Sequence, residues 1–140
     1  MKPTLVPGMT TRLRITVDRD RTIGFMGEAL RVYATPMMLR DVERTCRDFL
    51  AEHLDAGENS VGARVELDHM GATLVGMWVD ITATVAAIEG RRVTFDCEAH
   101  DALDQVGKCR HVRFVVDLDR QRQRLEAKAA KVAALPPDAG

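Results

Sequence analysis

The stretch Tyr33-Ala-Thr-Pro-Met-Met-Leu-Arg-Asp-Val-Glu43-Arg-Thr-Cys46 decides the fold, because it predicts one long amphipathic helix. Thr35 is a favourable N-cap residue, and Pro36 suits the first helical position, where its missing N–H needs no partner. The helix is expected to continue to about Leu54, since Ala56-Gly57 is typical of a helix C-terminus. At about 100° per residue, its apolar positions form one stripe that consists of Leu39, Val42, Cys46, Phe49 and Leu50.

Glu43 falls inside this apolar stripe. The opposite face carries the residues that water would solvate, namely Arg40, Asp41, Arg44, Arg47, Asp48 and Glu52. A glutamate is almost never fully buried unless it is paired, and an unpaired carboxylate in an apolar site tends to take up a proton. Glu43 is therefore expected to have a partner, to face an open cleft or to act in catalysis. The alternative is a structural carboxylate that pairs with an arginine.

The remaining sequence predicts antiparallel strands around this helix. Residues 9–17 alternate between apolar and polar and predict a first strand before the helix. After Gly57 the period changes from helical to two, which predicts strands at 61–69, 78–88, 93–99 and 112–118. Glu89-Gly90 is expected to form the turn of a hairpin. The order predicts an α+β fold, in which a curved antiparallel sheet wraps one central helix.

Length and composition limit the organisation and the function. The chain of 140 residues has room for one domain with a core, which we place at residues 1–118, followed by a charged C-terminal helix and tail at 119–140. A net charge of −1 gives no indication of nucleic acid or of an anionic membrane. No apolar run approaches the length of a membrane span, and residues 1–9 lack the apolar core of a secretory signal.

Cysteine and histidine spacing gives no metal or disulfide signal. The three cysteines lack a C-x-x-C pair, so we expect reduced thiols in a cytoplasmic protein. The four histidines show no ligand spacing, so no metal is expected. Neither a nucleophile-elbow motif nor a glycine-rich phosphate loop is present in the sequence. Four strand arginines are expected on solvated edges and strand faces, where some could bind phosphates: Arg91, Arg92, Arg110 and Arg113.

Several stretches resemble the fluoroacetyl-CoA thioesterase group of hot-dog proteins. They are Val32-Tyr-Ala-Thr-Pro-Met-Met38 followed by Glu43, Ser60-Val-Gly-Ala63 followed by Asp68-His69, Ile88-Glu-Gly-Arg-Arg-Val93, and Ala99-His-Asp101. The resemblance covers most of residues 9–118, and it implies the hot-dog fold. Two features differ from the group. The aromatic lid that precedes the threonine is replaced by Phe25-Met-Gly-Glu-Ala-Leu30, and the helix carries Arg40-Asp41 where many relatives are apolar.

The resemblance implies that Thr35, Glu43 and His69 act on an acyl-CoA thioester at a dimer interface, with the backbone N–H of Gly62 facing the thioester carbonyl. A desolvated carboxylate can act as nucleophile or as general base, and a histidine can transfer protons near neutral pH. Each residue also has a structural interpretation. Thr35 could cap the helix, His69 could bond a neighbouring carbonyl at a strand end, and Gly62 could allow a bulge or close packing.

These observations predict an acyl-CoA thioesterase for small or medium acyl groups, with CoA present only as part of the substrate and no separate cofactor. A homodimer or a dimer of dimers is expected, because pairing would cover a sheet edge and a cleft. The alternative is a non-catalytic hot-dog module that binds acyl-CoA or another apolar ligand. A hot-dog hydratase is a third possibility, which the sequence favours less because it has no paired Asp/His arrangement of that type.

Overall fold

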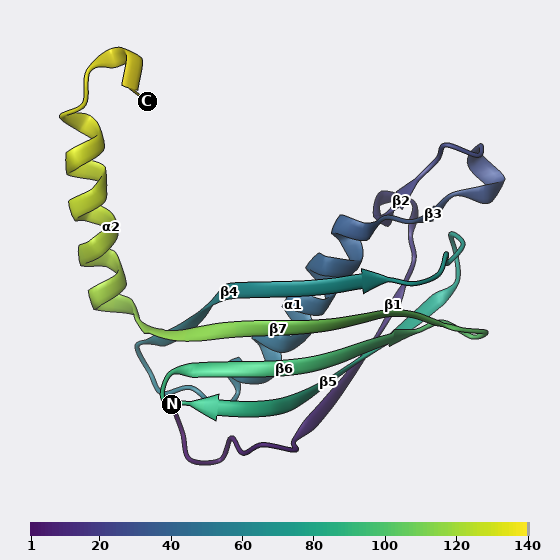
Figure 1. The fold of residues 1–140 in the computed structure, drawn as a ribbon, viewed down its shortest axis with the longest axis horizontal. Helices are drawn as coiled ribbons and strands as arrows, with labels where there is room; N and C mark the ends of the chain where they lie inside the picture. Colours follow the sequence, from purple (N-terminus) through teal and green to yellow (C-terminus); the bar gives the residue numbers. More distant parts are fainter. Residues whose placement is uncertain (140) are drawn as a thin grey trace.

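The computed structural model describes residues 1–139 and shows one curved five-stranded antiparallel sheet, one helix on its concave side and a second helix that projects from one end (Figure 1). Residue 140, the last of the predicted tail, lies outside the described residues. In chain order the elements are β1 (Thr10–Thr16), η1 (Arg19–Arg21), β2 (Thr22–Ile23), η2 (Glu28–Leu30), β3 (Val32–Tyr33), α1 (Thr35–Ala51), β4 (Glu58–His69), β5 (Trp78–Glu89), β6 (Arg92–His100), β7 (Gln105–Asp117), α2 (Leu118–Ala133) and η3 (Pro137–Ala139), where η denotes a short 3-10 helix.

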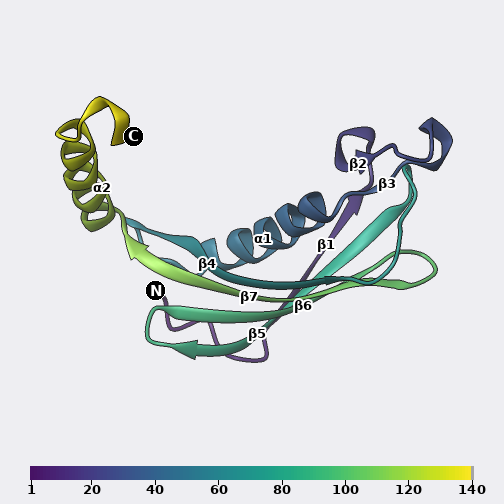
Figure 2. The same ribbon diagram turned by 45° about the horizontal axis from the view of Figure 1, so that its top comes forward.

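The sheet order is β1-β5-β6-β7-β4, so β4 lies at an edge and pairs on one side only, with β7. Figure 2 shows α1 inside the curve of this sheet. The predicted α+β arrangement, with one helix wrapped by an antiparallel sheet, is therefore confirmed. The last strand is longer than expected, because it begins at Gln105 and the turn before it occupies only residues 101–104.

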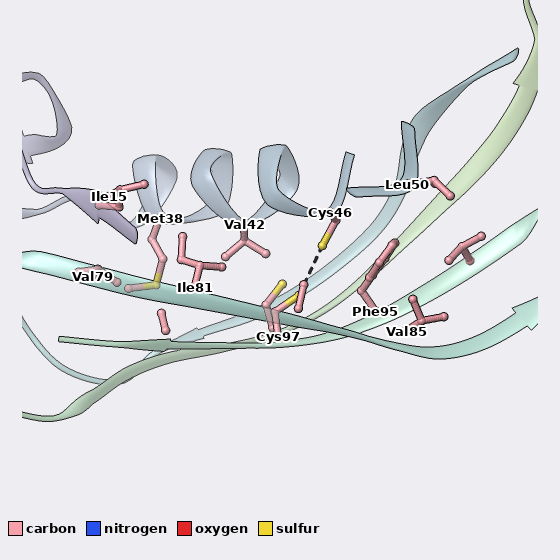
Figure 3. Packing of buried hydrophobic residues seen from close by; sticks show 14 of the residues in the cluster. Ile15, Met38, Val42, Cys46, Leu50, Val79, Ile81, Val85, Phe95 and Cys97 are labelled. Carbon is pink, nitrogen blue, oxygen red and sulfur yellow. Dashed lines mark hydrogen bonds between the residues drawn. The ribbon is translucent and has the colours of Figure 1, made fainter. Parts of the chain in front are cut away.

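The core lies between α1 and the sheet. Figure 3 shows Met38, Val42, Cys46 and Leu50 pointing from α1 toward sheet residues that include Val79, Ile81, Val85, Phe95 and Cys97. All four helix side chains are buried, and they follow one another at intervals of four residues, which is the spacing of one helix face. Burial of each large apolar side chain contributes roughly 1.5–3 kcal/mol, so this row fixes α1 on the sheet.

A bulge in β5 changes the expected face pattern. The register with β6 shifts between Val85 and Ala87, and beyond this point Ile88 packs against the core. The buried face of Val79, Ile81, Ala83 and Val85 therefore does not continue to Ala87, because one extra residue in a strand reverses the alternation.

Asp41 is the buried carboxylate of α1, which contradicts its predicted place on the solvated face. Its side chain is 1% exposed. Arg21 donates Nε–H to Oδ2 at 2.9 Å and Nη2–H to Oδ1 at 3.1 Å, and the Tyr33 hydroxyl also donates to this carboxylate. Both partners come from the irregular segment before the helix, so this segment closes over one side of α1. Burial, together with the bond to Asp41, raises the pKa of Tyr33 well above its usual range.

The ends of α1 also differ from the prediction. Ala34 is the N-cap residue and its side chain makes no capping bond, while Thr35 is already helical. Thr35 is therefore not the N-cap. At the other end the regular helix stops at Ala51, and the N–H groups of Glu52 and His53 bond to carbonyls three residues back before Gly57 turns the chain with φ 82°.

The C-terminal helix α2 extends away from the sheet (Figure 1). Asp117 accepts a hydrogen bond from the Arg120 N–H at 3.0 Å and so caps its N-terminus. Three apolar residues of α2 are exposed, with Leu118 at 41%, Leu125 at 57% and Val132 at 52%.

Among residues 1–139, none of the helices has the length and the apolar character needed to cross a bilayer.

Candidate active site

Thr35 and His69 lie together where the first turn of α1 meets the end of β4. The distance between Thr35 Oγ1 and His69 Nδ1 is 2.7 Å, and the tautomer of the imidazole decides which of the two atoms donates. The hydroxyl that was predicted as a possible helix cap therefore binds the histidine instead. A hydroxyl bonded to an imidazole is the arrangement in which a proton can pass between the two groups.

The surroundings of His69 favour its neutral form. Burial lowers the pKa of His69, and a backbone hydrogen bond to Gly71 opposes this shift without cancelling it. The Tyr33 ring lies edge-on to the imidazole, with the ring centroids 6.3 Å apart. At neutral pH the imidazole is thus available to accept a proton, which a permanently charged imidazolium could not do.

Glu43 lies two turns further along α1, beside Gly62 of β4. A Cβ atom built at Gly62 would be 3.5 Å from Glu43 Oε2, 3.4 Å from His111 Cε1 and 3.7 Å from Arg113 Nη1. The absent side chain thus leaves the Glu43 carboxylate next to the strand backbone. The register of β4 with β7 shifts between Gly62 and Arg64, as expected for a glycine at a bulge. Glu43 itself is half-buried, and within residues 1–139 it forms no ion pair shorter than 4 Å.

Beneath Glu43, three polar side chains form a buried network that the sequence interpretation missed. Arg113 is 4% exposed and donates Nε–H to Ser60 Oγ at 2.8 Å and Nη2–H to the Ser60 carbonyl at 3.0 Å. The Arg113 Nη1 atom lies 3.2 Å from His111 Nε2. On the other side of the ring, His111 Nδ1 lies 2.9 Å from the Arg64 carbonyl.

The hydrogen bonds of this network determine the tautomer of His111 and its charge. A carbonyl only accepts, so Nδ1 of His111 carries the proton and Nε2 accepts from Arg113. Burial and the adjacent Arg113 charge lower the pKa of His111 and keep the ring neutral. Burial also lowers the pKa of Arg113, whereas the charge of Glu43 raises it. The prediction that Arg113 lies on a solvated strand face is wrong. Its position two residues before the buried Val115 was the signal, since alternate strand residues share a face.

An open hollow of about 520 Å³ lies along α1 on the Glu43 side. Four of its lining residues are arginines, and the full set consists of Pro36, Leu39, Arg40, Glu43, Arg44, Arg47 and Arg113. Leu39, which was predicted to lie in the core stripe, is half-buried and lines this hollow. Among the described residues that line this hollow, Glu43 is the only acid, and the others are four arginines, Pro36 and Leu39.

The structure brings the predicted site residues together in two pairs. Thr35 contacts His69, and Glu43 lies against Gly62, but no hydrogen bond joins the pairs within residues 1–139. At a helical rise of about 1.5 Å per residue, the Cα atoms of Thr35 and Glu43 are about 12 Å apart. A substrate group would have to lie between the pairs to contact both.

The segment before α1 carries exposed apolar side chains at the end where Thr35 lies. Phe25 is 74% exposed and Met26 is 61% exposed, and neither contributes to the buried core. Apolar side chains that remain exposed at the rim of a site can contact an apolar part of a ligand.

Comparison with known proteins gives a consistent result. The model of the family described as fluoroacetyl-CoA-specific thioesterase matches residues 17–119. The curated fluoroacetyl-CoA thioesterase of Streptantibioticus cattleyicolor is 34% identical over 97 residues, which cover 69% of this chain and 70% of that protein.

Solved structures of thioesterases and of a hot-dog-like protein superpose well on this chain. A mutant of the fluoroacetyl-CoA-specific thioesterase FlK superposes with a TM-score of 0.81 at 29% identity, covering 91% of this chain and 99% of that chain. A thioesterase-superfamily protein from Thermus thermophilus gives 0.86 at 26% identity, covering 95% and 99%. A hot-dog-like protein from Thermanaerovibrio acidaminovorans gives 0.81 at 25% identity, covering 91% and 93%, so the fold is the hot-dog fold.

Proposed function

Since the chain belongs to the fluoroacetyl-CoA-specific thioesterase family and is a thioester hydrolase, we propose that it cleaves the CoA thioester of a small or medium acid with Thr35, Glu43 and His69. The observation that supports this proposal most is the Thr35–His69 pair, with a distance of 2.7 Å, on the same side of α1 as the accessible Glu43 carboxylate. Relatives whose structures contain fluoroacetate and CoA, or acetyl-CoA, bind ligands of this class.

In this proposal the thioester lies between the two pairs, along the side of α1 on which His69 and Gly62 of β4 lie. Glu43 takes a proton from water as the water oxygen attacks the thioester carbon, or its carboxylate attacks that carbon directly. The Gly62 N–H stabilises the negative charge that develops on the carbonyl oxygen. When the C–S bond breaks, the thiolate of CoA leaves with the electron pair. His69 relays a proton from solvent to this thiolate while Thr35 orients the imidazole, and Glu43 releases the proton it took from water to solvent, so both residues return to their starting states.

The two routes differ in where oxygen from water first appears. If Glu43 attacks, the first turnover forms a mixed anhydride, and its hydrolysis in heavy-oxygen water can place the label in the Glu43 carboxylate. If Glu43 activates water, the label appears only in the released acid. Label found in Glu43 by mass spectrometry of the protein after a single turnover therefore identifies direct attack by Glu43.

We further propose that the active form is a homodimer, paired through β4. This strand has 12 residues and hydrogen bonds to β7 on one side only, and residues 61–64 on it are exposed. A long free edge is a template for pairing, and natural proteins rarely leave one uncovered. Since Gly62 belongs to this edge and lies beside Glu43, pairing would bring the second subunit close to the Glu43 carboxylate.

The test is thiol release from a series of acyl-CoAs, from acetyl to long-chain and aryl, by the wild type and three variants. Glu43→Gln, His69→Ala and Thr35→Ala should each lower kcat/KM, with a loss of about 100-fold or more for Glu43→Gln. Glu52→Gln makes the same chemical change at the exposed residue that follows α1 and serves as the control. Full activity of Glu43→Gln would overturn the assignment. A folded protein that binds acyl-CoA without releasing thiol would instead be a binding module.

A further inference from the structure

The arginine hollow beside Glu43 points to the acyl group of the substrate. We infer that this hollow binds a carboxylate at the far end of the acyl chain, so that the preferred substrates are CoA half-thioesters of short dicarboxylic acids. This inference rests on the proposed function, because it assumes that the thioester lies at Glu43.

The charge of the hollow is the first argument. Four arginines and one glutamate line it, while the whole chain carries a net charge of −1. Arg47 bonds to its neighbour Asp48, with both distances 3.1 Å. In the part of the chain that the structure describes, Arg40, Arg44 and Arg113 have no carboxylate within 4 Å. Three of the four arginines that line the hollow therefore have no carboxylate in contact among the described residues.

The second argument is the repulsion between the arginines of α1 that line the hollow. Arg40 and Arg44 are four residues apart on α1, and Arg44 and Arg47 are three apart, so like charges are neighbours on one helix face. Such like-charged pairs destabilise a helix, while Glu43, four residues before Arg47, and Asp48, four residues after Arg44, supply opposite charges on the same helix. The core row of α1 includes none of the three. A bound anion would compensate this repulsion.

The third argument is the buried Arg113 at the base of the hollow. Ser60 and His111 hold its guanidinium in one orientation through three hydrogen bonds, which leaves two of its five N–H donors for other groups. A guanidinium that is fixed in advance loses little side-chain freedom when it binds, and its planar donors match a carboxylate.

The position of the hollow selects the acyl end over the CoA end. Glu43 lines the hollow and is also the group proposed to act at the thioester carbon. Arg40 and Arg44 lie within one helical turn of Glu43, so an anion that they bind would be close to that carbon. The phosphates of CoA are separated from the thioester by the whole pantetheine arm, whereas the second carboxylate of a short dicarboxylic acid is only a few methylene groups away.

The experiment compares two acyl groups of equal length on two carriers. Glutaryl and pentanoyl thioesters have the same number of carbons, and only glutaryl ends in a carboxylate. Each is prepared as the CoA ester and as the N-acetylcysteamine ester, which carries no phosphate. Thiol release is measured with background hydrolysis subtracted, for the wild type, for the Arg40→Gln/Arg44→Gln double variant and for Arg122→Gln on α2 as the control.

We expect the wild type to prefer glutaryl over pentanoyl by about tenfold or more in kcat/KM on both carriers, as for a charge-assisted contact. The double variant should lower this ratio by about tenfold, while Arg122→Gln keeps it. Equal rates for the two acyl groups on either carrier would overturn the inference and leave the thioesterase proposal intact.

A loss in the double variant that is equal for both CoA esters and absent for both N-acetylcysteamine esters would assign the arginines to the CoA phosphates and would also overturn the inference. Failure of the wild type to release thiol from any of the esters, including acetyl-CoA, would overturn the proposed function itself.

Discussion

Two carboxylates of α1, Asp41 and Glu43, lie two residues apart, and we predict that Asp41 is needed for stability and Glu43 for activity. Asp41→Ala should destabilise the protein while each folded molecule retains most of its activity. Glu43→Gln should abolish most activity with little change in stability. The prediction follows from their contacts, since Asp41 is buried between Arg21 and Tyr33 while Glu43 lines the open hollow.

These contacts determine how much the free energy of unfolding should fall in Asp41→Ala. Removal of one partner of a buried ion pair costs roughly 3–5 kcal/mol. The lower end applies here, because the Arg21 side chain is 18% exposed and keeps a hydrogen bond to Asp18 at 2.8 Å. Alanine recovers roughly 0.5 kcal/mol through its higher helix propensity. The net loss in the free energy of unfolding is therefore about 2.5 kcal/mol, a large fraction of the roughly 5–15 kcal/mol of a typical domain.

Urea denaturation followed by circular dichroism measures this loss. With an m-value of about 2 kcal/mol/M, the midpoint of Asp41→Ala should fall by about 1.2 M. Tyr33→Phe removes one hydrogen bond to the same carboxylate and should cost about 1.5 kcal/mol, which provides an internal scale. Glu43→Gln should change stability by less than about 1 kcal/mol. Equal losses for Asp41→Ala and Glu43→Gln, or a midpoint change below about 0.3 M for Asp41→Ala, would refute this division.

Further predictions concern titration, thiols and the turn of the hairpin. The pKa values of His69 and His111 are lowered in the folded protein, so below the usual histidine pKa of about 6.5 the unfolded chain binds more protons than the folded one. The free energy of unfolding should therefore fall as the pH drops from 6.5 toward 5.5, by up to about 1.4 kcal/mol per pH unit for each histidine. Urea midpoints that stay constant over this range would contradict the assignment, and His69→Gln should reduce the dependence of the midpoint on pH. All three cysteines are buried, and burial raises the pKa of Cys109 to about 12. Ellman's reagent should therefore label essentially none of them in the folded protein and all three in denaturant, and rapid labelling of the native state would show that the core opens. Gly90 has φ 62° at the tip of the β5–β6 hairpin, so Gly90→Ala should lower the free energy of unfolding by about 1 kcal/mol, a loss that a urea titration would detect.

The elements that follow a regular period could be predicted from the sequence. The apolar positions of α1 and the alternation in the later strands are local signals, and they were sufficient for the α+β arrangement. The pairing of Thr35 with His69 had no local signal, because 34 residues separate them, and only the family resemblance suggested it.

The two errors with most consequence involve charged residues that are buried by distant partners. A helical projection places Asp41 on the solvated face, and its burial depends on Arg21 and Tyr33, which lie in a segment without clear periodicity. Arg113 lies on the buried face of β7, whereas the prediction placed it on a solvated edge or strand face. Sequence patterns describe which face a residue occupies, and whether a charge on that face is compensated depends on the tertiary structure.

The helix α1 carries the side chains that pack in the core and the arginines that line the hollow (the hollow row) on different faces. Met38, Val42, Cys46 and Leu50 attach the helix to the sheet, while Arg40, Arg44 and Arg47 face the hollow and are not part of the core. Mutations in the second row can thus accumulate with little effect on folding, so a duplicated gene could acquire a different acyl preference by a few substitutions. The hollow row is accordingly the place where paralogues of this chain should diverge first.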